Sequence, residues 1–281
     1  MRSNPKLLLV ALALPFVASA QLVKLEGAKV VQYKQVGEAK LFLHVFNPDG
    51  HEASASRPAI IFFFGGGWVG GTPKQFEPHC RHLASHGIVA ITTEYRVKSR
   101  NKTTPFACVA DGKSAIRFVR TNAGKLGVDP ARIAAGGGSA GGHVAAATGN
   151  CPGLEEKGED GAVSSKPNAL VLFNPVYDNG PKGYGHDRVK MRWKEISPMH
   201  NLRKGAPPTI VFLGTQDKLI PVSTGREYDR RMKAIGSRSE LHLYEGATHG
   251  FFNKGRKGDH YADTIKKMDA FLLKLGWLKE K

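Results

Sequence analysis

A serine lies among glycines in the segment Gly136–Gly142, which has the sequence GGGSAGG. The short apolar run Ile133–Ala135 precedes this segment, and a run of small residues typical of a helix follows it. Glycines two positions before and after Ser139 allow a strand to turn sharply into a helix without a Cβ clash. Such a strand–turn–helix holds the serine oxygen in a strained, accessible position from which it can attack a substrate. We therefore predict that Ser139 is a nucleophile.

A histidine and an aspartate follow later strand-like runs, where they could complete the chemistry of a serine nucleophile. His249 follows the run Leu241–Tyr244 and could accept the serine proton and return it to a leaving group. Asp217 follows the run Thr209–Leu213 and could orient the imidazole and stabilise its charged form. Residues just beyond the carboxyl ends of parallel strands gather at one sheet edge. The sequence therefore predicts a catalytic triad of these three residues.

Four other histidines are interpreted as structural or surface residues, and one further aspartate is an alternative to Asp217. The chain has 11 histidines. His79, His82 and His86 lie on a predicted helix and are interpreted as surface or structural residues, and His143 is expected to pack against the sheet. Asp178, which follows an earlier strand-like run, is the alternative acid. No Cys-x-x-Cys motif or Cys/His metal spacing is present, so no metal site is expected.

A third glycine-rich feature could supply the donors for a developing oxyanion. Three glycines lie between Phe64 and Trp68, at the end of a predicted strand. Without side chains, their backbone N–H groups can point at one spot. We assign the oxyanion hole to the amides of Gly66, Gly67 and Ala140, the residue that follows the nucleophile. One such donor typically stabilises a transition state by about 3 kcal/mol.

The same glycines also match the G-x-G-x-x-G pattern of dinucleotide-binding proteins. Residues 65–70 follow a predicted strand, and Glu94 lies where a ribose-binding acid would be expected. Residues 136–141 match the pattern as well, so the pattern has little specificity in this chain. A nicotinamide-dependent oxidoreductase would leave Asp217 and His249 unexplained. We therefore disfavour that class and expect no cofactor.

Apolar runs and helical patterns alternate along the chain. Residues 28–46 alternate between apolar and polar, as two antiparallel strands would. Continuous apolar runs, which suit strands covered on both faces, are Ala59–Phe64, Ile88–Thr92, Ile133–Ala135, Leu170–Phe173, Thr209–Leu213 and Leu241–Tyr244. Helical patterns cover residues 74–86, 107–125, the segment after Ser139, 222–236 and 260–275, the last capped by Asp259. This order predicts a single α/β domain over residues 21–281. We expect a doubly wound, mostly parallel sheet of about eight strands, helices on both faces and no large lid domain.

Residues 1–20 have the pattern of a secretory signal peptide. Arg2 and Lys6 form a basic region, Leu7–Val17 an apolar stretch, and Ala18–Ala20 a small-residue cleavage site. The apolar stretch is too short for a membrane span, and no later run is long enough. We therefore expect cleavage before Gln21 and a secreted or periplasmic protein without stable membrane insertion.

Charge and cysteine content narrow the range of partners. The formal net charge of +17 could attract an anionic partner such as an acidic polysaccharide. Alternatively, the charge only keeps the protein surface soluble. The basic residues are dispersed and lack interleaved aromatics, so no nucleic-acid partner is expected. Export would permit one disulfide among Cys80, Cys108 and Cys151, and three buried thiols are the alternative. The sequence does not indicate an oligomeric state.

Four motifs together resemble those of a known family. They are Phe64–Trp68, Gly137–Gly142, Asp217 with Pro221, and His249–Phe251. In this combination the chain resembles the α/β-hydrolase carboxylesterases, and in particular the hormone-sensitive-lipase-like and acetyl-esterase branch. The resemblance covers nearly all of the chain after residue 20. It implies an α/β-hydrolase fold, a cofactor-free mechanism and carboxylic ester substrates.

The chain departs from that family in two places. Phe64 stands where the family usually has a histidine that holds the oxyanion loop, so the loop must be braced differently. Residues 21–58 are predicted to form strands instead of the branch's helical N-terminal cap, which favours an open cleft. The leading hypothesis is a secreted serine carboxylesterase that removes short, acetyl-type acyl groups from a small ester or an acetylated polysaccharide. A feruloyl esterase, a general short-chain esterase or a lipase is the alternative, and a non-catalytic binding protein would need a broken triad.

Overall fold

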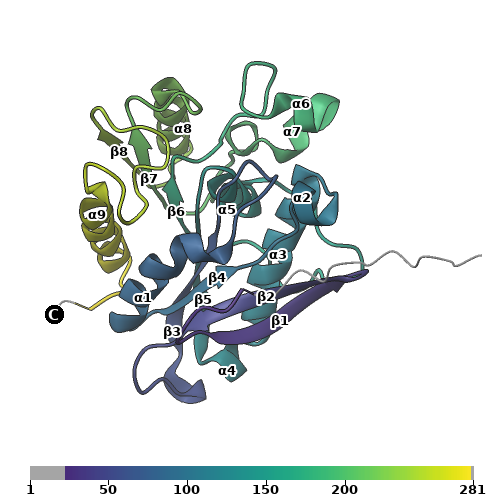
Figure 1. The fold of residues 1–281 in the computed structure, drawn as a ribbon, viewed down its shortest axis with the longest axis vertical. Coiled ribbons are helices and arrows are strands. Elements are labelled where there is room, and N and C mark those ends of the chain that lie inside the picture. The colour runs from purple at the N-terminus through teal and green to yellow at the C-terminus, as the bar shows by residue number, and fades with distance from the viewer. Residues whose placement is uncertain (1–22, 280–281) are drawn as a thin grey trace, which may run out of the picture.

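One open sheet of eight strands organises the computed structural model, which describes residues 23–279 (Figure 1). The strands are β1 (Lys29–Val36), β2 (Ala39–Phe46), β3 (Arg57–Phe63), β4 (Val89–Thr93), β5 (Val128–Gly138), β6 (Ala169–Phe173), β7 (Thr209–Gly214) and β8 (Ser239–Tyr244). They lie in the order β1-β2-β4-β3-β5-β6-β7-β8. β2 pairs antiparallel with β1 and β4, and all other pairs are parallel. The predicted doubly wound, mostly parallel sheet is therefore confirmed.

Helices cover both faces of this sheet, as predicted. They are α1 (Glu77–Ser85), α2 (Lys98–Asn101), α3 (Pro105–Thr121), α4 (Ala123–Leu126), α5 (Ala140–Asn150), α6 (His186–Val189), α7 (Trp193–Ile196), α8 (Val222–Ala234) and α9 (His260–Lys274), with 3-10 helices at Ala53–Ala55, Pro73–Phe76, Lys190–Arg192 and Pro198–His200. Side chains of α3, α5 and α8 share one apolar cluster, those of α1 and α9 share a second, and a third, smaller cluster joins α3, α5, α6 and α7. The helices α1 and α9 therefore lie on the same face, as Figure 1 shows.

Burial explains why the central strands are continuous apolar runs. Every residue of β4, β6 and β7 is buried, because helices cover these strands on both faces. β1, at the edge of the sheet, keeps several residues exposed, and its burial does not alternate strictly because the register shifts between Gln32 and Lys34. The carboxyl ends of β3, β5, β6, β7 and β8 point to one edge of the sheet, and the segments that follow these ends carry the predicted site residues.

Two helix predictions differ from the structure. The pattern over residues 107–125 is two helices, because the Asn122 side chain donates to the carbonyl of Phe118 at 2.9 Å and the backbone turns there. The predicted cap at Asp259 is wrong. Asp259 has a left-handed backbone, with φ of 42°, and its side chain makes no capping hydrogen bond. Effective caps have an extended backbone, which turns the carboxylate towards the first free N–H groups of the helix.

The remaining sequence predictions concern cysteines, loops and termini. Cys80, Cys108 and Cys151 are buried free thiols, which decides between the two alternatives. Between β6 and β7 the described chain forms only short helical segments, so this connection holds no lid domain. Among residues 23–279, none of the helices has the length and apolarity needed to cross a bilayer. The predicted signal peptide, residues 1–20, lies outside the described residues.

Candidate active site

Ser139 occupies the turn between β5 and α5 in a conformation that few residues with a Cβ adopt. Its φ is 54° and its ψ is −120°. The strain is held by backbone hydrogen bonds on both sides. The Ser139 N–H donates to the carbonyl of Phe173 at 3.0 Å, and the Ser139 carbonyl accepts from the N–H groups of His143 and Val176. The hydroxyl is consequently presented at the edge of the sheet, in a partly exposed position.

The glycines around Ser139 are required by close backbone packing. A Cβ at Gly141 would lie 2.0 Å from the carbonyl oxygen of Phe63, and one at Gly137 would lie 2.5 Å from the carbonyl of Gly141. No side chain can shift to relieve contacts with backbone atoms. This packing brings the start of α5 against the end of β3, and so places the Phe64–Trp68 loop beside Ser139.

The structure brings the three predicted triad residues together. His249 Nε2 lies 2.9 Å from Ser139 Oγ, and His249 Nδ1 lies 2.7 Å from Asp217 Oδ2. The Asp217 side chain is 0% exposed, and its Oδ1 accepts the N–H groups of Leu219 and Ile220 at 2.8 and 3.0 Å. With its other oxygen so occupied, the carboxylate can hold the Nδ1–H of His249 and leave Nε2 free to accept the serine proton.

The alternative acid and the neighbouring histidine have other contacts. Asp178 Oδ1 accepts the Gly180 N–H at 2.6 Å and lies 3.8 Å from His200 Nδ1, so it does not orient His249. His143 is fully buried, with Nε2 3.0 Å from both Asn179 Oδ1 and the Ile196 carbonyl. Burial lowers the pKa of His143 to about 4, so its ring is neutral near pH 7. His143 was predicted to pack against the sheet; it is buried, but its contacts are with the β6–β7 connection and the Trp68 ring.

The predicted oxyanion donors lie beside the serine. Gly66 and Gly67 line the same cleft as Ser139 and have φ of 123° and 61°, values that favour glycine. Among the described residues, neither of their N–H groups donates to another group. Ala140 is the first residue of α5, where helical N–H groups have no partner within the helix. All three amides are therefore available to an oxygen bound at Ser139.

Tyr95 and Gln75 brace the oxyanion loop in place of the family's histidine. The Phe64 ring stacks on Tyr95 with centroids 4.2 Å apart, and the Tyr95 hydroxyl donates to the Phe64 carbonyl at 2.6 Å. Gln75 Oε1 accepts the Gly65 N–H at 2.6 Å, and Gln75 Nε2 donates to Asn253 Oδ1 at 3.0 Å. The loop is thus tied to the segment that follows His249. The sequence analysis missed this tie because its ends are 178 positions apart.

Asn174 is a second residue that the sequence analysis missed. It directly follows β6, has a φ of 33°, and accepts the Gly250 N–H with Oδ1 at 3.0 Å. Its Nδ2 lies 3.4 Å from His249 Nε2. Asn174 therefore helps to hold the histidine loop. Its position could have indicated a role in the site, because Asn174, like Asp217, directly follows the end of a buried strand.

The cleft over these residues has a volume of about 370 Å³ and a positive lining. Arg188 and Arg256 line it, and its lining includes no acidic residue. The Arg188 guanidinium donates to the Gly67 carbonyl at 2.5 Å and lies over the Trp68 ring, 5.8 Å from its centroid. A second cavity of about 360 Å³ lies near Arg120 and Lys166; Ser164 lines it, but its lining includes no histidine and no carboxylate that could activate this serine.

Family models match both halves of the chain. The BD-FAE model matches residues 43–177, and the dienelactone hydrolase family model matches residues 177–281. Among curated proteins, esterase LipC of Mycobacterium tuberculosis is 31% identical over 217 residues, which cover 69% of this chain. The match spans only 53% of LipC, so the chain corresponds to about half the length of this relative.

Solved structures match over a larger share of both chains. Esterase 2 of Thermogutta terrifontis, phosphorylated by paraoxon, is 45% identical with a TM-score of 0.88, and the match covers 92% of this chain and 98% of that one. The Thermogutta terrifontis esterase Est2 with propionate bound is also 45% identical, with a TM-score of 0.87 and coverage of 91% and 97%. Identity at this level and over nearly the whole length indicates shared ancestry as well as a shared fold.

Proposed function

Because the chain belongs to the esterases of the α/β-hydrolase fold, we propose that it hydrolyses carboxylic esters with short acyl groups. Ser139 is the nucleophile, His249 the base and Asp217 the acid that orients the base. One observation carries the proposal: an unbroken series of hydrogen bonds, 2.7 and 2.9 Å long, runs from Asp217 through His249 to Ser139 Oγ at the cleft. A nucleophile, a base and an orienting group within hydrogen-bond reach are what acyl transfer requires.

The proposed reaction passes through an acyl-enzyme. Ser139 Oγ attacks the ester carbonyl carbon while its proton moves to His249 Nε2, and Asp217 stabilises the imidazolium. The carbonyl oxygen becomes an oxyanion that accepts N–H groups from Gly66, Gly67 and Ala140. The intermediate collapses, and the C–O bond to the alcohol breaks as His249 protonates the alcohol oxygen. Water then attacks the acyl carbon with His249 as base, which releases the carboxylic acid and restores the serine.

The cleft supports a preference for short acyl groups. Its volume is about 370 Å³, and Val69 and Leu219 line it as partly exposed apolar side chains. A volume of this size lies at the small end of ligand sites. The related esterase Est2 has been solved with propionate bound, a short carboxylate. We expect turnover of nitrophenyl esters to be fastest for acetate to butyrate and to fall steeply for longer chains.

The positive lining supports an anionic alcohol component. Arg188 and Arg256 line the cleft, and the whole chain carries a formal net charge of +17. Together with the predicted signal peptide, this supports the removal of acetyl groups from an acidic polysaccharide outside the cytoplasm. Acetate release should be compared between acetylated polymers that carry uronic acids and neutral acetylated xylan. A rate advantage for neutral polymers would contradict this choice, and release of ferulate instead of acetate would favour a feruloyl esterase.

Covalent labelling tests the proposed nucleophile directly. Wild-type protein treated with paraoxon should gain the mass of one diethylphosphoryl group, and Ser139→Ala should gain none. The related esterase 2 has been solved as its paraoxon-phosphorylated form. A wild-type chain that gains no label and hydrolyses no ester of any acyl length would be a binding protein.

A further inference from the structure

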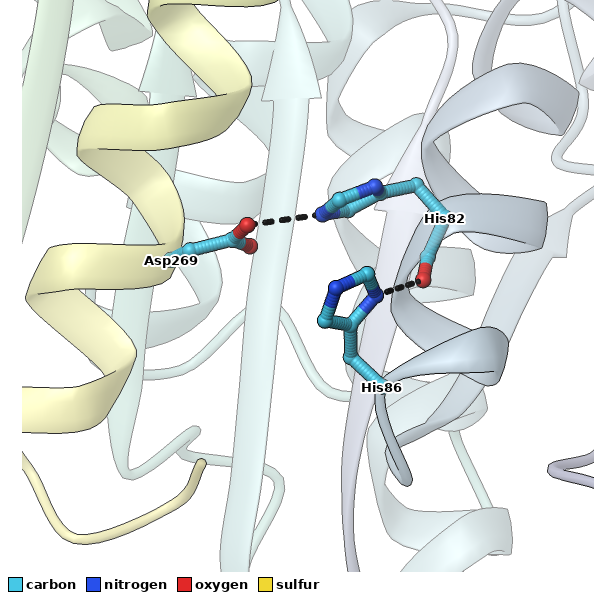
Figure 2. Close-up of side chains that lie close together, drawn as sticks. All are labelled: His82, His86 and Asp269. Atoms are coloured by element: carbon cyan, nitrogen blue, oxygen red, sulfur yellow. Dashed lines mark hydrogen bonds and ion pairs between the residues drawn. The ribbon is translucent and has the colours of Figure 1, made fainter. Parts of the chain in front are cut away.

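A second group of chemically active side chains lies away from the cleft, between α1 and α9 (Figure 2). His82 belongs to α1, His86 directly follows that helix, and Asp269 belongs to α9. One atom from each residue can be chosen so that all three lie within 4.8 Å of one another. Figure 2 shows His82 and Asp269 facing each other across the space between the helices, with the His86 ring beside them.

The hydrogen bonds of His86 leave one ring nitrogen available as a ligand. His86 Nδ1 lies 2.8 Å from the backbone carbonyl of His82, which can only accept a hydrogen bond. Nδ1 therefore carries the ring proton, and Nε2 keeps a free lone pair. A backbone carbonyl that fixes the tautomer in this way is the usual partner of a histidine that ligates a metal through its other nitrogen.

Asp269 supplies a carboxylate with an unused oxygen. Its Oδ2 lies 2.8 Å from His82 Nε2. Its Oδ1 is buried, and no group among residues 23–279 donates a hydrogen bond to it. A buried carboxylate oxygen without a partner is costly. The side chains of His82 and Asp269 are 24% and 25% exposed, so the group is open to ions from solvent.

We propose that His82, His86 and Asp269 bind a divalent transition-metal ion of the zinc class. Two imidazole nitrogens and one carboxylate oxygen form a donor set that Zn²⁺ prefers, and a water molecule would complete a tetrahedron. The spacing of four positions places both histidines on one side of a helical turn. Ligand atoms around tetrahedral zinc lie about 3.3 Å apart, so rotations of partly exposed side chains suffice. The ion takes the place of the proton on His82 Nε2, which leaves for solvent or moves to Nδ1.

The ion would join α1 to α9, two helices that are far apart in the sequence. His82 and Asp269 are separated by 187 positions. Because the three ligands come together only in the folded chain, an ion bound there stabilises the native state. This site is independent of the proposed hydrolysis, and its ion takes no part in the reaction. The expectation of no metal site rested on spacing along the sequence, and ligands from distant helices leave no such spacing.

The test is zinc binding to chelator-treated, full-length protein. Calorimetric titration should show one ion bound per chain with micromolar affinity. Zinc at about 100 times its Kd should raise the melting temperature by roughly 5 °C or more. Co²⁺ in place of Zn²⁺ should give the visible absorption of a four-coordinate nitrogen–oxygen site. Absence of both binding and stabilisation would overturn the proposal.

Matched variants locate the site. His86→Ala keeps the pair between His82 and Asp269, so the variant should fold normally but bind zinc about tenfold or more weakly. Asp269→Asn should weaken binding similarly. The control is His242→Gln, because His242 lies 4.0 Å from Glu240 but belongs to no group of three ligands among the described residues. Zinc affinity that is unchanged in His86→Ala and Asp269→Asn would place the ion elsewhere and refute the site.

Discussion

Two histidine–aspartate pairs in this molecule have almost the same length and different surroundings. His249 and Asp217 meet at 2.7 Å, and His82 and Asp269 meet at 2.8 Å. The Asp217 side chain is 0% exposed, and its second oxygen accepts two backbone N–H groups. The Asp269 side chain is 25% exposed, and its second oxygen has no partner within residues 23–279. The first carboxylate can therefore only orient an imidazole, whereas the second can also coordinate an ion.

The distance within a histidine–aspartate pair does not define the role of the pair. The role depends on what the remaining polar atoms face. The second nitrogen of His249 faces Ser139 Oγ at 2.9 Å, so the pair can move a proton. The pair between α1 and α9 has no hydroxyl in that position, and the neighbouring group is the His86 ring, 4.2 Å from the His82 ring.

Removing the hydroxyl that His249 faces should have the largest effect. In Ser139→Ala the imidazole has no proton to accept, so kcat for nitrophenyl acetate should fall by about 10⁶-fold. The melting temperature should stay close to that of the wild type, since alanine fits the same turn without the hydroxyl. Steady-state kinetics and thermal unfolding measure the two quantities. Activity near the wild-type level would remove Ser139 from the mechanism.

Exchanging one carboxylate in each pair tests the comparison most directly. Asp217→Asn cannot stabilise the imidazolium, and we expect kcat to fall by about 10⁴-fold. Asp269→Asn makes the same chemical change in the other pair and should leave kcat unchanged. Asp178→Asn should also be nearly silent. If Asp178→Asn were the damaging variant and Asp217→Asn the silent one, the assignment of the acid would be wrong.

Acid should weaken the fold through two buried histidines, His79 and His143. Burial lowers the pKa of His79 to about 3 and that of His143 to about 4, from the ordinary 6.5. Below pH 6.5 both histidines are protonated in the unfolded chain but remain neutral in the folded protein. The free energy of unfolding therefore falls as the pH falls towards 4. At pH 5 each histidine should cost about 2 kcal/mol.

His79→Phe separates the two contributions to this pH dependence. His79 lies among aromatic rings, including Phe76 and Phe252, so a phenyl ring suits the site and does not titrate. The variant should lose about half of the stability change that the wild type shows between pH 7 and pH 5, as measured by urea unfolding. An unaltered pH dependence would show that other groups cause the acid sensitivity.

Loosening the oxyanion loop should have the smallest effect. Gln75→Met removes the hydrogen bonds to Gly65 and Asn253 at similar side-chain length. The donors of the loop act mainly in the transition state, so kcat should fall by about tenfold while KM changes little. The control is Gln32→Met, on the exposed edge of β1. A rise in KM with an unchanged kcat would mean that Gln75 shapes substrate binding and does not position the donors.

Much of the fold was predictable because buried strands leave a simple signal. Every predicted strand is present, but the first and last residues of a strand differ from the prediction where the strand extends beyond its apolar run. β5 begins at Val128, although the apolar run begins at Ile133, because residues 129–132 extend the strand while remaining exposed or half-buried. The positions of Ser139, Asp217 and His249 were predictable because chain order and strand ends bring them to one edge.

Other features depend on tertiary contacts, which the identity of a single residue does not predict. Gln75 and Asn253 are ordinary polar residues until the fold places their side chains 3.0 Å apart. Asp259 resembles a helix cap in sequence, but its backbone conformation prevents the hydrogen bond. The network of Lys34, Asp111 and Glu156, with contacts of 2.6 to 2.7 Å, likewise joins three distant segments. The signal peptide and the substrate remain predictions.

The order of the three proposed catalytic residues along the chain has a consequence for biosynthesis. Ser139 leaves the ribosome 110 residues before His249. Throughout that interval the nascent chain lacks His249, the proposed base, even after β7 and β8 have been made. The growing chain therefore cannot hydrolyse esters by the proposed mechanism during this interval. Hydrolysis can begin only once the last third of the protein has been made and has joined the sheet.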